Sequence, residues 1–248
     1  MITPMVRWTI GPVKKIGFEI LFESVFSFAK IYPEFNKIVC YNNIDFNCIR
    51  HLQKNCNIEL QQENFAPCQL LNPSANPEEA TGCGWKLVPP RLNPDGLELF
   101  IDNDIIIRKR LPQIDEWLER KDCGLIAEGL SRKRMYGVFD PFVPPNIHAN
   151  AGLFGLPPGF DFGKQIADYA NFLTGGLGGY NEQGLTVATI VNMPQYIMVP
   201  LSKLHISEDH ADFPEKMPDA IHFVGANRKE WHRGWAHYKK ITRGILMM

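Results

Sequence analysis

The sequence predicts an α/β protein with a mostly parallel central sheet and helices on both faces. Short apolar strands alternate with helical segments over the first 60 residues, the order that parallel strands with covering helices require. Residues 97–101 then form a nearly continuous apolar run, which is typical of a strand buried on both faces. At 248 residues the chain fits one large α/β domain, so we expect a single domain over residues 1–248.

The first 60 residues are predicted to contain three strands and two helices. The first strand, residues 7–10, ends at the turn Gly11-Pro12, and a helix follows Gly17. This helix is expected to end before Pro33, because a proline disfavours helical geometry at the residue that precedes it. A second strand (37–41), a second helix (45–55) and a third strand (57–60) complete this part of the chain.

Regular elements return after a long irregular stretch, residues 64–94, in which proline and glycine are frequent. A second proline-rich loop is expected over residues 128–149, and loops of this length in a compact domain usually carry function. Asp161 and Asn181 are expected to cap the last two helices, because their side chains can accept hydrogen bonds from free backbone amides. The predicted elements are a strand at 97–101, extended residues 105–107, a helix at 112–119, strands at 124–127 and 150–156, and helices at 161–173 and 182–191.

Composition and charge argue against several classes of protein. Lys and Arg number 26 against 27 Asp and Glu, so the net charge of −1 gives no sign of a nucleic-acid-binding surface. The longest apolar stretch, residues 16–32, contains Glu19, Glu23 and Lys30, so we expect membrane contact that is at most peripheral. The six cysteines include no C-x-x-C pair, and the start of the chain lacks a signal-peptide pattern. These features favour a cytoplasmic protein with reduced thiols.

An acidic triplet, Asp102-Asn103-Asp104, directly follows the apolar strand at 97–101. The carboxyl ends of sheet strands are where open α/β sheets bind ligands. Because side chains alternate along an extended strand, we expect Asp102 and Asp104 to point to the same side. Paired carboxylates suit Mn²⁺ or Mg²⁺, which also takes oxygens from a diphosphate. The alternative interpretation is an ordinary strand-end turn, in which Asp and Asn are common.

A late segment, residues 221–232, carries a second group of candidate ligands. His222 is a candidate third metal ligand, since imidazole suits Mn²⁺ in particular. Gly225 would let the backbone approach a phosphate, and Arg228 or Lys229 would neutralise its charge. The same segment, which includes Trp231, is equally consistent with an aromatic cap on the fold.

Two further groups of polar side chains begin regular elements. Asn150-Ala-Gly152 opens a predicted strand, and Glu182-Gln183 opens a predicted helix. Amide and carboxylate groups at these places can bind the hydroxyls of a sugar. The alternative for Glu182 and Gln183 is that they only satisfy backbone amides and the helix dipole in the first turn.

The order of these motifs resembles that of glycosyltransferases of the GT-A fold. Five features carry the resemblance, in this order along the chain. They are the strand-helix-strand start, D-x-D at a strand end, N-A-G-L on a later strand, a helix that opens with E-Q, and a late segment with histidine, glycine, a cationic residue and tryptophan. The most similar pattern is that of the retaining group that contains glycogenin and bacterial lipopolysaccharide galactosyltransferases. The resemblance extends over roughly residues 7–235 and rests on short motifs.

The resemblance implies roles for the candidate residues. It makes Asp102, Asp104 and His222 ligands of Mn²⁺ or Mg²⁺, with Asp102 also in reach of the ribose. It places Asn150 and Gly152 at the donor sugar and Glu182 with Gln183 beside the reactive carbon. The residues that it places near the diphosphate and the base are Gly225, Arg228, Lys229, Trp231, Thr9 and Ile10.

Two positions depart from the pattern of this group. The usual Lys-Pro-Trp is here Lys229-Glu230-Trp231, and Glu182 stands where the group has aspartate. The longer side chain of Glu182 leaves the choice of donor sugar open. The first strand departs from the base-binding pattern of the group, and Thr9 and Ile10 are the residues of this strand that we assign to the base.

The expected activity is metal-dependent transfer of a sugar from a nucleoside-diphosphate sugar to an acceptor hydroxyl, with retention of configuration. A UDP-sugar is the favoured donor, and the acceptor is expected to be a carbohydrate or a glycolipid. The loops 64–94 and 128–149 are expected to shape the acceptor side and to close over the donor. An inverting enzyme would instead need Asp140, Glu128 or Glu182 as general base. The remaining alternatives are a metal-dependent nucleotidyltransferase and a carbohydrate-binding module without catalysis.

Overall fold

A computed structural model describes residues 2–13, 15–42, 44–62, 84–131, 134–170, 172, 180–207, 216–224 and 234–242. Its centre is a seven-stranded sheet with the strand order β3-β2-β1-β4-β7-β6-β8. The strands are β1 (Met5–Ile10), β2 (Asn36–Tyr41), β3 (Glu59–Gln62), β4 (Glu98–Ile101), β6 (Gly124–Glu128), β7 (Ala149–Leu156) and β8 (Tyr196–Val199). All neighbouring strands run parallel except β7, which is antiparallel to both β4 and β6. The predicted mostly parallel α/β architecture is therefore confirmed.

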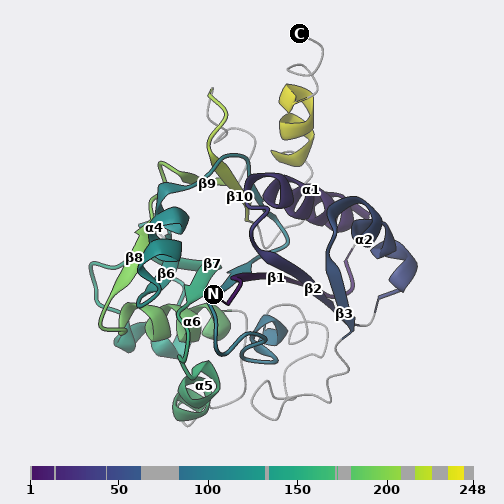
Figure 1. Cartoon of the computed structure of the whole chain (residues 1–248). Helices are drawn as coiled ribbons and strands as arrows, with labels where there is room; N and C mark the ends of the chain where they lie inside the picture. The colour runs from purple at the N-terminus through teal and green to yellow at the C-terminus, as the bar shows by residue number, and fades with distance from the viewer. Residues whose placement is uncertain are drawn as a thin grey trace.

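Helices cover both faces of this sheet (Figure 1). On one face, α1 (Lys15–Ile31), α2 (Arg50–Cys56) and α4 (Pro112–Arg120) contribute to one apolar core with alternate residues of β1 and β4. On the other face, α5 (Phe162–Ala170) and α6 (Asn181–Val191) enclose a second core, together with the 3₁₀ segments η3 (Gly84–Leu87) and η4 (Gly137–Phe142). Alternation explains the division, since successive side chains of a strand point to opposite faces.

A second, three-stranded sheet has the order β5-β10-β9. It consists of β5 (Ile105–Ile107), β9 (Leu204–Ser207) and β10 (Ala220–Phe223). Residues 105–107 were expected to continue the extended run of β4, but the chain turns after Ile101 and β5 pairs antiparallel with β10. A helix at residues 234–242 lies beside α1, where the Trp235 Nε1 atom donates a hydrogen bond to Glu19 at 3.2 Å (Figure 1).

Several predicted boundaries need correction. The predicted helix at 45–55 is a 3₁₀ turn, η1 (Phe46–Cys48), followed by α2. Asp161 does cap its helix, accepting from the Lys164 amide at 2.8 Å, whereas Asn181 does not cap α6. The N-cap of α6 is Tyr180, and the Asn181 side chain instead accepts from the Val138 amide of η4 at 3.0 Å. Within the described ranges, no helix has both the length and the apolar character needed to cross a membrane.

Candidate functional site

The carboxyl end of β4 brings the acidic triplet against the second sheet. Asp102 and Asp104 do not lie on an extended strand, as the sequence suggested, but in a turn that the Ile105 amide closes onto the Asp102 carbonyl at 3.1 Å. The turn leads into β5, which pairs with β10, and in this pairing Ile105 lies opposite His222. The Phe223 amide also donates to the Asp104 carbonyl at 3.0 Å. Residues 117 and 119 positions apart in the sequence thereby lie side by side.

The side chains of Asp102, Asp104 and His222 form a compact group of donor atoms. One ligand atom from each lies within 4.8 Å of the others. The Nε2 atom of His222 is 3.4 Å from Asp104 Oδ1 and 4.0 Å from Asp102 Oδ2. Asp104 Oδ1 is buried and has no hydrogen-bond partner among the described residues. A divalent cation binds its oxygen ligands at about 2.0–2.6 Å, so these three residues fit a single ion.

The start of β7 lies directly beside this group. Because β7 is antiparallel to β4, its first residues meet the carboxyl end of β4, and the Asp102 amide donates to the Gly152 carbonyl at 2.7 Å. Asn150 Oδ1 accepts from the Gly152 amide at 2.8 Å. A Cβ atom at position 152 would overlap the Cε1 atom of His222, so only glycine lets the histidine approach this closely.

The first turn of α6 contributes Glu182 and Gln183. Gln183 accepts from Asn150 Nδ2 at 3.2 Å and donates through Nε2 to the Met135 carbonyl at 3.0 Å. These bonds tie α6 to β7 and to the residues that precede η4. The four residues predicted at the donor sugar, Asn150, Gly152, Glu182 and Gln183, therefore lie together in the folded chain.

Lys86 occupies the centre of the site, although it was not among the residues predicted from the sequence. Its Nζ atom lies 2.8 Å from Glu182 Oε1 and 3.1 Å from Asp102 Oδ1, and it donates to the Ala151 carbonyl at 3.1 Å. The lysine comes from η3, within the irregular stretch predicted at 64–94. An irregular segment has no periodic pattern that relates its side chains to a sheet, so Lys86 could not be recognised from the sequence.

The three carboxylates are crowded, with Asp104 and Glu182 buried and Asp102 half-buried. Burial raises the pKa of Glu182 to about 7, and the charge of Asp102 adds to this effect while Lys86 opposes it. Desolvation also raises the pKa of Asp102, against the opposing effect of Lys86. Asp102, Asp104 and Glu182 together carry more negative charge than one lysine neutralises. The arrangement therefore favours the binding of a further positive charge.

The remaining predicted residues are placed as follows. Thr9 and Ile10 end β1, next to β4 in the sheet. The Ile10 side chain is only 1% exposed, so of this residue only the backbone can reach a ligand, and its carbonyl accepts from the Asn42 amide at 3.2 Å. The predicted residues Gly225, Arg228, Lys229 and Trp231, with positions 64–83 of the first loop, lie outside the described residues.

No family model matches the sequence, and no curated protein matches it. Solved structures of glycosyltransferases do match the fold. The chain superposes on WbbM, a bifunctional glycosyltransferase, with a TM-score of 0.62 at 13% identity, covering 91% of this chain and 46% of WbbM. It superposes on the galactosyltransferase LgtC, solved with donor and acceptor sugar analogs, with a TM-score of 0.62 at 12% identity and 94% of both chains. For mouse xyloside xylosyltransferase 1 the TM-score is 0.53 at 9% identity, covering 92% of this chain and 98% of the other.

These likenesses establish the fold. The chain has the GT-A glycosyltransferase fold, as the order of its motifs predicted. It spans about half of the WbbM chain and nearly all of LgtC. Identities of 12–13% are too low to carry an activity from one protein to another, so the activity has to be argued from the site.

Proposed function

We propose that this chain is a metal-dependent glycosyltransferase that moves a sugar from a nucleoside-diphosphate sugar to an acceptor hydroxyl with retention of configuration. The observation that carries the proposal is the group formed by Asp102, Asp104 and His222, in which the buried Asp104 Oδ1 atom has no hydrogen-bond partner within the described part of the chain. On a GT-A fold this group lies at the carboxyl end of β4, where α/β sheets bind nucleotides. Fold and donor chemistry therefore support the same class of reaction.

In this proposal Asp102, Asp104 and His222 hold Mn²⁺ or Mg²⁺, a choice supported by two hard oxygen ligands and one imidazole. When bound, the ion neutralises negative charge on the leaving diphosphate. Lys86 holds its ammonium between Asp102 and Glu182, where it adds a second positive charge to the site. We assign Gly225, Arg228, Lys229 and Trp231 to the diphosphate side on the basis of the sequence pattern.

Glu182 and Gln183 are proposed to lie next to the carbon from which the sugar is transferred. Glu182 is the buried carboxylate of this group, and Lys86 holds one of its oxygens. Gln183 is bonded to Asn150 and to the Met135 carbonyl, so its amide is held in a fixed orientation. Asn150 and Gly152 are proposed to bind the sugar. A carboxylate and an oriented amide are suitable for stabilising positive charge at the reacting carbon.

The proposed donor is a UDP-sugar, with Thr9 and Ile10 at the base, and the proposed acceptor is a carbohydrate or a glycolipid. The likeness to LgtC, which was solved with donor and acceptor sugar analogs, supports sugars on both sides of the reaction. We propose that the protein acts as a single cytoplasmic domain. The loops 64–94 and 128–149 are proposed to shape the acceptor side.

The proposal is tested by Asp104→Asn, which replaces one carboxylate oxygen by an amide nitrogen that cannot bind a cation. Mn²⁺ binding, followed by electron paramagnetic resonance, should be lost, and Mn²⁺-dependent hydrolysis of a UDP-sugar should fall by roughly 10²–10³-fold. Thermal unfolding without metal should change little. Asp122→Asn is the matched control, since this carboxylate is 67% exposed and lies outside the site.

The possible outcomes separate the proposal from its alternatives. Unchanged Mn²⁺ binding by Asp104→Asn would overturn the metal assignment. Binding of a UDP-sugar to the native chain without any hydrolysis or transfer would instead favour a carbohydrate-binding module. If UDP, GDP and CDP with Mn²⁺ all leave the melting temperature of the native chain unmoved, the nucleotide-sugar proposal fails.

A further inference from the structure

Arg7 is a charged residue in the middle of the buried strand β1. Its neighbours Val6 and Trp8 face the core that contains α1, whereas Arg7 points to the opposite face. There its guanidinium lies 4.0 Å from the centre of the Phe100 ring. The side chain is 1% exposed, so its charge has to be satisfied within the protein.

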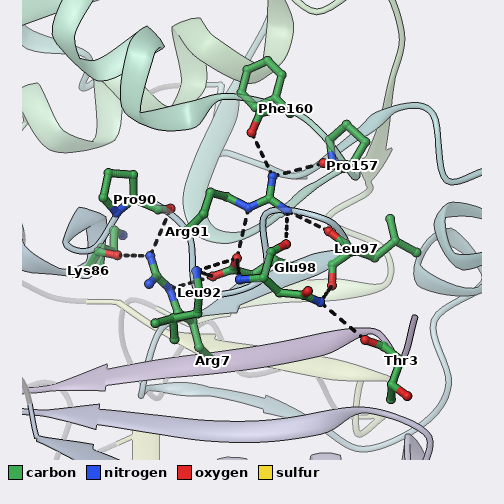
Figure 2. Close-up of polar contacts among 12 residues, drawn as sticks. Thr3, Arg7, Lys86, Pro90, Arg91, Leu92, Leu97, Glu98, Pro157 and Phe160 are labelled. Atoms are coloured by element: carbon green, nitrogen blue, oxygen red, sulfur yellow. Dashed lines mark hydrogen bonds and ion pairs between the residues drawn. The ribbon is translucent and has the colours of Figure 1, made fainter. Parts of the chain in front are cut away.

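Glu98 of β4 provides the opposite charge. Its Oε1 atom is 3.3 Å from Arg7 Nε, and its Oε2 atom is 3.0 Å from Arg91 Nε (Figure 2). The same carboxylate accepts hydrogen bonds from the amides of Leu92 and Asn93. Glu98 therefore fixes the orientation of both arginines and of the irregular segment 86–97, which runs from η3 to β4.

The two arginines hold different parts of this segment. Arg7 Nη2 donates to the Lys86 carbonyl at 2.9 Å and lies 3.5 Å from the Pro90 carbonyl (Figure 2). Arg91 instead donates to the carbonyls of Asn93, Gly96, Pro157 and Phe160 at 2.7–3.0 Å. Carbonyls of irregular backbone lack the repeating partners of a helix or sheet, so side-chain donors of this kind determine where the backbone lies. Of the two, Arg7 is the one bonded to the backbone of Lys86.

We propose that Arg7 is a positioning residue for Lys86, which acts at the site described above. The bond from Arg7 fixes the backbone of Lys86 on the face of the sheet opposite to α1, while the lysine ammonium reaches Asp102 and Glu182. A lysine side chain is long and rotatable, so the location of its backbone decides whether the ammonium reaches both carboxylates. The inference rests on the proposed function only for its catalytic consequence, because the placement of Lys86 can be measured without turnover.

The first test measures access to Lys86 directly. The native chain and Arg7→Lys are treated with an amine-acetylating ester, and the modification rate of Lys86 is followed by mass spectrometry relative to the exposed Lys164. A lysine at position 7 keeps the charge beside Glu98, but one ammonium cannot replace a guanidinium that contacts Glu98 and the Lys86 carbonyl through different nitrogens. We expect Lys86 to be acetylated several-fold faster in Arg7→Lys.

Arg91→Lys is the matched control. Arg91 is also buried and paired with Glu98, but its other hydrogen bonds go to the carbonyls of Asn93, Gly96, Pro157 and Phe160 and not to Lys86. Both substitutions should lower the melting temperature, whereas only Arg7→Lys should change the acetylation rate of Lys86. Equal rates at Lys86 in the native chain and Arg7→Lys would overturn the inference, as would an equal increase in both variants.

The second test uses turnover and the additivity of substitutions. Arg7→Lys should lower kcat for hydrolysis or transfer on the order of 10–100-fold, the cost of a displaced active-site group. In a Lys86→Met background the same change should have no further effect, because residues that act through one another are not additive. An undiminished effect of Arg7→Lys in that background would show that Arg7 does not act through Lys86.

A second variant keeps the inference testable if Arg7→Lys does not fold. Arg7→Met removes the donor to the Lys86 carbonyl together with the buried charge, while Glu98 keeps Arg91 as its partner, so no carboxylate is left unpaired. Lys86 should again be acetylated faster, and an unchanged rate in the folded Arg7→Met variant would overturn the proposal. Absence of any turnover by the native chain would count against the proposed function, while the acetylation result would still decide the role of Arg7.

Discussion

Two groups of buried charges share one lysine. The backbone of Lys86 is bonded to the group of Arg7, Glu98 and Arg91. Its ammonium contacts Asp102 and Glu182, which with Asp104 form the second group. In the first group, Glu98 receives two arginines and two backbone amides. In the second, Asp104 Oδ1 is buried and no described residue offers it a hydrogen bond, and the pKa of Glu182 is raised to about 7, mainly by burial.

The difference separates a structural use of buried charge from a functional one. A charge that holds the fold is stabilising only when its hydrogen-bonding capacity is filled from within the protein. A binding site instead keeps part of that capacity open for a ligand, at a cost in stability of the unliganded chain. The following predictions test whether the two groups differ in this way.

The largest effect is expected from Glu98→Leu, which would leave Arg7 and Arg91 without their shared carboxylate. Breaking a buried ion pair in this way costs about 3–5 kcal/mol of unfolding free energy. Thermal or urea unfolding measures the loss. Glu119→Leu is the control, because Glu119 is exposed and its replacement should change the free energy of unfolding by about 0.5 kcal/mol or less. A loss as small as the control would contradict the structural role of the first group.

Glu182→Gln is expected to stabilise the folded chain at high pH, whereas Glu98→Leu is expected to destabilise it. Because the folded pKa of Glu182 is raised from 4.5 to about 7, the folded chain holds this proton more tightly than the unfolded chain. The stability of the native chain without metal should therefore fall as the pH rises from about 4.5 to 7. Gln cannot ionise, so the variant should melt higher than the native chain at pH 8 and equally at pH 4.

Chelator-treated protein is required for this measurement, since a bound cation would offset the cost of the carboxylates. Glu116→Gln serves as the control, because this side chain is 53% exposed and its replacement should give no pH-dependent difference. A melting temperature of Glu182→Gln below that of the native chain at pH 8 would mean that the pair with Lys86 is structural. The contrast between the two groups would then be lost.

The smallest effect is expected at a third, more exposed group, where Glu19 joins α1 to the helix at 234–242. Hydrogen bonds from Trp235 and then Lys239 lower the pKa of Glu19. This contribution is present above the unfolded pKa and is lost as the pH falls through the lowered folded value. Glu19→Gln should cost about 0.5 kcal/mol at pH 7, because such partly exposed pairs are screened by water, and less at pH 3.

Hydrogen exchange of residues 234–242 measures this local effect. Faster exchange in Glu19→Gln at pH 7, with unchanged exchange in β4, is the expected pattern. An effect as large as that of Glu98→Leu would show that burial does not determine how much these charges contribute.

Much of the site could be predicted because it lies where regular elements end. Asp102 and Asp104 follow an apolar strand, and Glu182 opens a helix, so their places follow from periodicity and from the rule that ligands bind at the carboxyl ends of strands. The extended backbone expected for the triplet was nevertheless wrong, although the two carboxylates do approach the same point, as expected. Asp102 and Asp104 come together in a turn closed by the Ile105 amide, a detail that depends on the pairing of β5 with β10.

The sequence alone determined the fold class, the end of β4 and the set of candidate ligands, because these depend on local apolar patterns and on short motifs. Only the tertiary structure placed the Lys86 ammonium between Asp102 and Glu182, and the Arg7 guanidinium against the Lys86 carbonyl. Both placements depend on an irregular segment whose course is determined by contacts with residues about 80 positions away. Such contacts have no period in the sequence, and the charges of Arg7 and Glu98 within otherwise apolar strands are local signs that buried partners exist.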